Sequence, residues 1–389
     1  MTQRSIVSRF VLTAATVAVF AAASTASAGG RVVAVGDIHG NYDGFVTILQ
    51  QAGLVDEDTH WIGGETTFVQ TGDVFDRGVD IRKILDLLMR LQDEAAAAGG
   101  EVVALIGNHE GMNLMGYYRD VNPDVFATFV DDQSGKRRKA AFKEFKQYLK
   151  ASAKAAGVEA PAVTSEMKDR WMAAVPPGWL EHNQALGPDG RYGAWLRTCP
   201  VGVVIDGTLF IHGGVGPDLA GLSVDEINAK VASEIETYDR LREVMIRDRL
   251  VPSTAELASL INAYQKQDPP DPALIELADA GQWFIRSPGG PLWFRGAAKW
   301  EEETQTEEML ELLAGAGAER MVGGHTVQRE GHIQARFGGR VFLIDTGMLS
   351  SVYTGGQPSA LVIEDGVFTA IYTDGSSEVL VDTTLANAA

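Results

Sequence analysis

Five short turns carry the residues of this chain that could do chemistry. Each turn places Asp, Asn or His directly after a predicted hydrophobic strand, with glycine nearby so that the backbone can turn sharply. The ends of strands hold their side chains rigidly in position, as a metal or catalytic site requires. The turns are Gly36-Asp-Ile-His-Gly40, Gly72-Asp-Val-Phe-Asp-Arg-Gly78, Gly107-Asn-His-Glu-Gly111, Ile211-His-Gly-Gly214 and Gly323-Gly-His-Thr-Val327.

Oxygen and nitrogen donors recur in all five turns. One such turn alone is typical of a polar loop or a helix cap, but five after strands in one chain indicate a site. A donor set without thiolates suits Mn, Fe, Zn or Co better than Ca or Mg alone. Six groups are too many for one tetrahedral ion and suit two ions about 4 Å apart that share a carboxylate, for which Asp73 is the natural candidate. The candidate ligands are Asp37, His39, Asp73, Asn108, His212 and His325.

These turns need strands that share a direction. Apolar runs predict strands at 31–35, 67–70 and 102–106, and apolar positions at helical spacing predict two helices between them. This β-α-β-α-β order indicates an α/β core with polar loops collected at the carboxyl ends of the strands. Further strands are predicted at 201–205, 208–211, 319–322, 340–344, 359–364, 367–373 and 378–381.

Residues 112–200 and 218–282 interrupt this rhythm and look largely helical. We therefore predict a single catalytic domain over residues 29–389 with two helical insertions, rather than two domains. Outside the five turns, His60, His182 and His332 are expected at the surface. Three tryptophans, at positions 171, 179 and 195, are expected to form the core of the first insertion.

The first 28 residues are typical of a secretory signal peptide. Arg4 and Arg9 precede an apolar run over residues 10–23, and Ala26-Ser27-Ala28 has the small residues of a cleavage site. We predict cleavage after Ala28 and a periplasmic or secreted protein without a stable membrane anchor. The alternative is an uncleaved N-terminal anchor.

The net charge of the chain restricts the classes of partner that it can bind. The formal net charge is −19, and loss of residues 1–28 removes two arginines and no acid, which gives about −21. So acidic a chain repels nucleic acid backbones, and no nucleic-acid partner is expected. Small anionic substrates are not excluded, because bound cations can invert the local field. Cys199 is the only cysteine, so the chain has no intrachain disulfide.

The motif set resembles the phosphoprotein phosphatases among the calcineurin-like metallophosphoesterases. Their signatures are Gly-Asp-x-His-Gly, Gly-Asp-x-x-Asp-Arg-Gly and Gly-Asn-His-Glu, and all three occur here. The later Pro291-Leu-Trp-Phe-Arg-Gly296 and Gly324-His-Thr-Val-Gln328 are similar to the Shewanella-like branch. Val327 stands where many metallophosphoesterases have a second histidine, which disfavours a phosphodiesterase or nuclease.

The resemblance implies a four-layer α/β core, with two mixed β-sheets flanked by helices and the metal ions at the strand ends. It also implies a division of the ligands between two divalent ions. The first ion would bind Asp37, His39 and Asp73, and the second would bind Asp73, Asn108, His212 and His325.

The expected reaction is hydrolysis of a phosphomonoester. Two divalent ions lower the pKa of a bridging water, so that hydroxide is available near neutral pH for in-line attack on phosphorus. Arg77 and Asn108 are the candidates that position the phosphoryl oxygens. Arg295 is a further candidate by resemblance, and a surface ion pair is the alternative for this residue.

The leaving oxygen needs a proton, and His109 can give it if it is held as the imidazolium. Asp76 could bind the far ring nitrogen and raise the pKa of His109, as in the family's Asp-His pair. The alternative for Asp76 is that it caps the helix from Val79 onward. Glu110 and Asp345 remain without an assigned role, as supporting acids near the site.

Three functions follow from this sequence. The leading one is a secreted or periplasmic metal-dependent phosphatase that acts on a phosphoprotein (Ser/Thr or Tyr) or on a small phosphoester. A hydrolase of dinucleoside polyphosphates would use the same metal set. A metal-binding protein without turnover is the alternative from another class, but it would need none of Arg77, His109 and Asp76.

Overall fold

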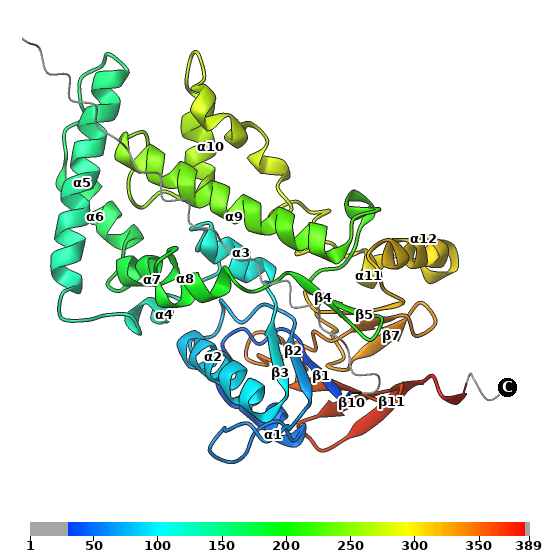
Figure 1. The fold of residues 1–389 in the computed structure, drawn as a ribbon. Coiled ribbons are helices and arrows are strands. Elements are labelled where there is room, and N and C mark those ends of the chain that lie inside the picture. Colours follow the sequence, from blue (N-terminus) through cyan, green and yellow to red (C-terminus); the bar gives the residue numbers. More distant parts are fainter. Residues whose placement is uncertain (1–29, 386–389) are drawn as a thin grey trace, which may run out of the picture.

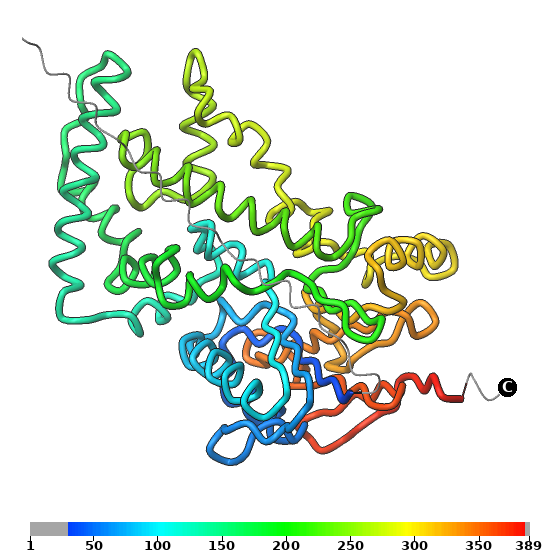
Figure 2. The backbone as a smooth tube through the Cα atoms, in the orientation of Figure 1, coloured from blue at the N-terminus to red at the C-terminus, as the bar shows by residue number. Residues whose placement is uncertain are grey.

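The structure is a computed structural model that describes residues 30–385. The predicted signal peptide, residues 1–28, lies outside the described residues, so cleavage after Ala28 and export stay predictions. Within residues 30–385, no helix is long and apolar enough to cross a membrane. Figure 1 shows the fold with its elements labelled, and Figure 2 shows the path of the backbone.

The first sheet begins with the predicted β-α-β-α-β run. Strand β1 (Val32–Val35) pairs in parallel with β2 (Thr67–Gln70), and β2 pairs in parallel with β3 (Glu101–Ala104). Helices α1 (Tyr42–Gln51) and α2 (Ile81–Ala98) connect these strands, and their apolar faces are buried in the core. The loops after all three strands therefore lie at the same edge of the sheet.

The C-terminal strands complete this sheet in the opposite direction. Strand β9 (Ser359–Glu364) pairs antiparallel with β1, and β10 (Val367–Tyr372) and β11 (Ser377–Asp382) follow as hairpins. The strand order is β11-β10-β9-β1-β2-β3. The sheet is therefore mixed, and the two ends of the described chain meet in it, as the blue and red strands of Figure 1 show.

The second sheet is also mixed, with the order β4-β5-β6-β8-β7. Its parallel centre consists of β5, β6 and β8, and antiparallel strands lie at both edges. The bounds are β4 (Gly202–Ile205), β5 (Thr208–Ile211), β6 (Arg320–Gly323), β7 (Gln334–Arg336) and β8 (Val341–Leu343).

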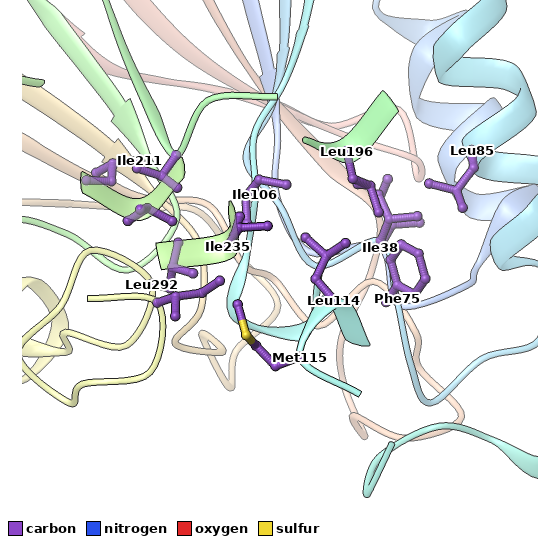
Figure 3. Packing of buried hydrophobic residues seen from close by; sticks show 14 of the residues in the cluster. Ile38, Phe75, Leu85, Ile106, Leu114, Met115, Leu196, Ile211, Ile235 and Leu292 are labelled. Atoms are coloured by element: carbon purple, nitrogen blue, oxygen red, sulfur yellow. The ribbon is translucent and has the colours of Figure 1, made fainter. Parts of the chain in front are cut away.

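The two sheets pack against each other through a buried apolar layer. Phe342 of β8 stacks on Phe368 of β10 with ring centroids 4.6 Å apart, and Ala34 and Val322 belong to the same cluster. A larger cluster lies between the sheets and the outer helices; Figure 3 shows some of its side chains. The predicted α/β core with two mixed sheets flanked by helices is thus confirmed.

Helices fill both predicted insertions. Those after β3 are α3 (Asn108–Leu114), α4 (Pro123–Ala127), α5 (Ser134–Ala155), α6 (Ser165–Ala174), α7 (Trp179–Leu186) and α8 (Arg191–Leu196). Those after β5 are η1 (Pro217–Leu219), α9 (Val224–Arg247), α10 (Leu257–Gln265), η2 (Pro272–Ala278) and η3 (Ala280–Gln282), and α11 (Gly296–Lys299) and α12 (Glu302–Gly315) precede β6. That all of these helices belong to one domain stays a prediction.

The structure differs from the sequence-based predictions at two places. Strand β7 was not predicted, because its three residues are mostly exposed and have no apolar alternation. His182 was expected at the surface but is only 1% exposed. Its ring lies edge-on to Tyr118, Phe126 and Phe129, with centroids 5.0–5.2 Å apart, and neither ring nitrogen has a hydrogen-bond partner. His60 and His332 are exposed, as expected.

The burial of His182 should make the protein sensitive to acid. Burial lowers the pKa of His182 to about 3, so the unfolded chain takes up this proton first as the pH falls below about 6.5. The contribution of His182 to stability is therefore lost with falling pH, by about 2 kcal/mol between pH 7.5 and 5. Replacement by phenylalanine, which suits the aromatic surroundings, should remove this loss.

Urea unfolding of wild type and His182→Phe at both pH values measures the difference. His332→Phe, at an exposed histidine, is the matched control and should keep the wild-type pH dependence. An equal loss of stability in wild type and His182→Phe would contradict the effect of burial.

Candidate active site

The fold brings all five turns together. Asp37 and His39 follow β1, Asp73 follows β2, and Asn108 begins α3 directly after the β3 loop. The other two histidines, at 212 and 325, follow β5 and β6 of the second sheet. All six predicted ligands are buried, each with 6% or less of its surface exposed. The site therefore lies where the carboxyl ends of parallel strands from both sheets meet.

Glycines let these turns approach one another. A Cβ atom on Gly107 would lie 2.4 Å from the backbone nitrogen of Asp73, and one on Gly324 would lie 2.2 Å from Asp37 Oδ1. Real Cβ atoms do not come this close, so a side chain at either position would push a candidate ligand out of place.

The turns themselves have unusual backbone conformations. Among the described residues, ten that are not glycine have a positive φ, and half of these lie in the site. Such angles cost free energy and persist only where the surrounding structure enforces them, which is common at functional sites. The site residues are His39 (φ 47°), Asp73 (φ 58°), Asp76 (φ 69°), Arg77 (φ 67°) and His325 (φ 66°).

Asp73 lies at the centre of the donor set. Its Oδ2 is 3.7 Å from His39 Nε2, and its Oδ1 is 3.3 Å from His212 Nε2. Two groups of ligand atoms that could hold an ion share this carboxylate: one contains His39 and His109, the other His212 and His325. The geometry therefore agrees with a carboxylate shared between two ions.

Three histidines are oriented by backbone carbonyls. A carbonyl oxygen only accepts, so the ring nitrogen beside it carries the hydrogen of the neutral imidazole, and the other nitrogen keeps a free lone pair. The contacts are His39 Nδ1 to Phe75 O (2.8 Å), His212 Nδ1 to Thr71 O (2.9 Å) and His325 Nε2 to Trp293 O (3.2 Å). Each histidine can thus present one defined nitrogen as a ligand.

The protonation of these rings is compatible with ligation. Burial lowers the pKa of His39 to about 3 and that of His325 to about 2, which keeps both rings neutral. Burial lowers the pKa of His212, but the charge and hydrogen bond of Asp73, together with Glu110 and the Thr71 carbonyl, raise it, so the net shift is upward. A cation on Asp73 would replace that proton, because a ligating imidazole must be neutral.

The buried acids fit divalent ions as well. Burial raises the pKa of Asp37, and the neighbouring Asp345 and Asp73 carboxylates raise it further. Burial likewise raises the pKa of Asp345 to about 6, and its Oδ2 atom is buried without a hydrogen-bond partner. A cation would relieve both effects, so the residues present fit the predicted metal centre.

Glu110 supports the Asp73 turn. Its Oε2 accepts hydrogen bonds from the backbone N–H groups of Asp73 (2.8 Å) and Gly107 (2.7 Å), and its Oε1 accepts from Val74 (2.8 Å) and Phe75 (3.1 Å). One buried carboxylate thus joins the turns after β2 and β3. Glu110, left without a role by the sequence, positions the central ligand.

His109 and Asp76 form the predicted pair. His109 Nδ1 lies 2.6 Å from Asp76 Oδ2, and both residues are buried. Burial lowers the pKa of His109, but the charges of Asp73 and Asp76 and the hydrogen bond to Asp76 raise it above its usual value. The alternative role of Asp76 was wrong, because the residue at the N-cap of α2 is Asp80.

Distance alone does not separate His109 from the ligands. Its Nε2 is 3.8 Å from Asp73 Oδ2, about as far as that of His39. The hydrogen bond to Asp76 favours the imidazolium, which cannot bind a cation but can give up a proton.

Two residues of the site were not found from the sequence. Asn113 donates one hydrogen bond to Asp76 Oδ1 (2.9 Å) and one to the carbonyl of His109 (3.0 Å). Its spacing of four residues from His109 on α3 was the available signal. Tyr353 lies 6.1 Å from the His39 ring, centroid to centroid, in a loop before β9, and no sequence pattern indicated it.

The two candidate arginines differ in position. Arg77 places Nη1 against His39 Nε2, and its guanidinium lies 5.5 Å from the Tyr353 ring centroid. Because an ion would need the same lone pair of His39, metal binding would free Arg77 for a phosphoryl group. Arg295 donates to the His325 carbonyl (2.8 Å) and to Thr326 Oγ1 (3.0 Å), so it also holds the last ligand turn.

Comparison with known proteins identifies the family of this chain. The model of the calcineurin-like phosphoesterases matches residues 30–329, which is most of the chain. The chain belongs to the calcineurin-like phosphoesterase family. The predicted class, a metal-dependent phosphatase, is thereby confirmed. The roles of the individual residues and the number and identity of the ions stay predictions.

Similar proteins agree with the predicted branch. Shewanella-like protein phosphatase 1 of Plasmodium berghei is 26% identical over 336 residues, 85% of this chain and 70% of the relative. Shewanella-like protein phosphatase 2 of Arabidopsis thaliana is 31% identical over 220 residues, 54% of this chain and 52% of the relative. Among solved structures, a cold-active protein-tyrosine phosphatase of a psychrophilic Shewanella species has a TM-score of 0.58 and 26% identity, over 90% of this phosphoesterase and 80% of that chain.

If Glu110 positions Asp73, the change Glu110→Gln should weaken metal binding. The amide of glutamine would turn an NH₂ group toward two backbone N–H donors, and the Asp73 turn would have to shift. Loss of such a supporting contact typically reduces metal affinity by about 10- to 100-fold. Metal titration of the purified, chelator-treated phosphoesterase measures this.

Glu234→Gln is the matched control. Glu234 is also buried and accepts two backbone hydrogen bonds, from Phe284 (2.9 Å) and Ile285 (3.0 Å), but it supports no candidate ligand. The metal affinity of the Glu234→Gln variant should equal that of the wild type. Equal affinity in both variants would show that Glu110 does not position the site.

Proposed function

We propose that this phosphoesterase is a periplasmic or secreted phosphomonoesterase that uses two divalent ions and acts on phosphoproteins. The observation that carries the proposal is the Asp76–His109 pair beside two donor groups that share Asp73. A protein that only stores metal would need no buried proton donor next to its ligands. The names of the Shewanella-like relatives support a protein substrate.

The ions would be held by the predicted ligands, with Asp37, His39 and Asp73 on one side and Asp73, Asn108, His212 and His325 on the other. When bound, two divalent ions supply a water of lowered pKa and positive charge beside the phosphoryl oxygens. Manganese is the first ion to test, although the ligands would also accept Fe, Zn or Co.

The chain's own residues supply the remaining steps. Arg77 binds phosphoryl oxygens through its guanidinium, which is well suited to tetrahedral oxyanions, and Asn108 is the second residue proposed to position them. As the bond from phosphorus to the leaving oxygen breaks, His109 gives its Nε2 proton to that oxygen. Asp76 keeps the ring in place and stabilises its charged form before transfer.

The proposed export rests on the sequence of residues 1–28. Fractionation of cells that express the full chain, with mass determination of the mature N-terminus, tests it. Cleavage after Ala28 and recovery outside the cytoplasm are expected, whereas a full-length chain in the membrane fraction would favour the uncleaved anchor.

Turnover assays test the activity directly. The mature chain with added Mn should release phosphate from p-nitrophenyl phosphate and from phosphopeptides that carry Tyr, Ser or Thr. Preferred cleavage of diadenosine tetraphosphate would support the dinucleoside polyphosphate hydrolase instead. Tight binding of two ions without turnover of any phosphoester would support the metal-binding protein.

The change His109→Ala should reduce kcat by about 10²- to 10⁴-fold, because the leaving oxygen loses its proton donor. The kcat for phenyl phosphate should fall more than the kcat for p-nitrophenyl phosphate, because phenolate is the stronger base and its departure depends more on protonation. Metal content should stay that of the wild type. His332→Ala, at an exposed histidine, is the control. Loss of metal in His109→Ala would instead show that His109 is a ligand.

A further inference from the structure

An apolar hollow of about 340 Å³ lies next to the site, over helix α3. Its lining includes Met112 of α3, Met115 directly after α3, Ala258 of α10, and Ile285 and Trp293. The helix α10 belongs to the second insertion, so this hollow combines the core of the phosphoesterase with a part that the family motifs do not include.

A second hollow, of about 460 Å³, adjoins it and extends to Arg295, a candidate phosphate-binding residue. Trp293 and Arg286 line both hollows, and Arg295 lines only the second. Arg295 donates to the carbonyl of His325, and the Trp293 carbonyl lies 3.2 Å from the ring of His325. The two hollows share Trp293 and Arg286 and therefore form one groove, and two residues that line it, Arg295 and Trp293, contact the turn of His325.

The distance along α3 suits a peptide. Met112 and Met115 lie three and six residues after His109, which at 1.5 Å per residue is about 5 to 9 Å along the helix axis. An extended peptide covers this distance in about two to three residues. A side chain close in sequence to a phosphorylated residue could therefore reach the hollow while the phosphate lies beside His109.

The chemistry of the walls selects the side chain. Methionine is adaptable and fits apolar groups of different shape, and Leu257, Ile285 and Trp293 add further apolar surface to the lining. The charged residues are Arg286, which is exposed and has no ion pair within residues 30–385, and the partly buried Glu256. The hollow thus suits an uncharged, apolar group.

We propose that this groove is the specificity site for protein substrates, and that its hollow takes a large apolar side chain one to three residues from the phosphorylated residue. The inference rests on the proposed phosphatase function and adds the substrate feature that it recognises. Burial of a leucine side chain in such a hollow should raise kcat/KM by about 10-fold or more over alanine.

The experiment compares phosphopeptides that differ at one position. Leucine replaces alanine one, two or three residues from the phosphorylated residue, on either side, and kcat/KM is measured with the Mn-loaded mature chain. At one or more positions the leucine peptide should be about 10-fold better. The change Ala258→Trp, at an exposed position of α10, should fill the hollow and bring this ratio to about 1.

Asn262→Trp is the matched control, because Asn262 is exposed on the same helix and does not line either hollow. It should keep the wild-type ratio. A ratio near 1 at every position in the wild type, or an unchanged ratio in Ala258→Trp, would overturn the proposed groove. A phosphotyrosine preference that Ala258→Trp abolishes would show that the hollow takes the phosphorylated ring itself and would also overturn it.

Wild-type turnover of p-nitrophenyl phosphate distinguishes failure of the phosphatase function from failure of the groove. If this substrate is hydrolysed but the peptides show no leucine effect, the phosphatase function stands and only the groove fails. If no phosphoester is hydrolysed, the function fails, and the proposed groove fails with it.

Discussion

The repulsion among buried carboxylates is the constraint on which the rest of this site depends. Asp37, Asp73 and Asp345 meet at the ends of strands from both sheets, almost completely buried. Burial raises the pKa of Asp37, and the carboxylates of Asp345 and Asp73 raise it further. The pKa of Asp73 is lowered despite its burial, because three histidines surround it. Such an arrangement is unfavourable for folding unless positive charge compensates it. A site of this kind is therefore built around cations, and its surroundings must resist the collapse or separation of its acids.

That resistance comes from the backbone. Glu110 ties the turns after β2 and β3 through four N–H groups, and Gly107 and Gly324 allow approaches that no side chain would permit. The positive φ angles of Asp73 and His325 add strain, which the packed sheets on both sides must offset. Stability is thus lowered locally so that ligand atoms from five turns can face one small volume.

Most of this core was predictable from the sequence, because strand-end motifs combine a hydrophobic run, a glycine and a polar residue in fixed order. Asp37, Asp73 and His325 were found in this way. Tyr353 was not, because it lies in a loop whose position depends on tertiary packing. His182 was misplaced because helical periodicity on α7 does not reveal that aromatic residues from two other segments enclose its ring. Contacts that join distant segments leave no local pattern.

The residues proposed for catalysis and those proposed for substrate specificity also lie in different parts of this fold. The predicted metal ligands and the proposed proton donor lie on short turns at the ends of strands, which hold side chains rigidly. The proposed groove beside them is lined partly by α10, which belongs to the second helical insertion. Relatives can therefore keep the turns and still differ in the insertion, so that substrate preference is free to change while phosphoryl transfer is preserved.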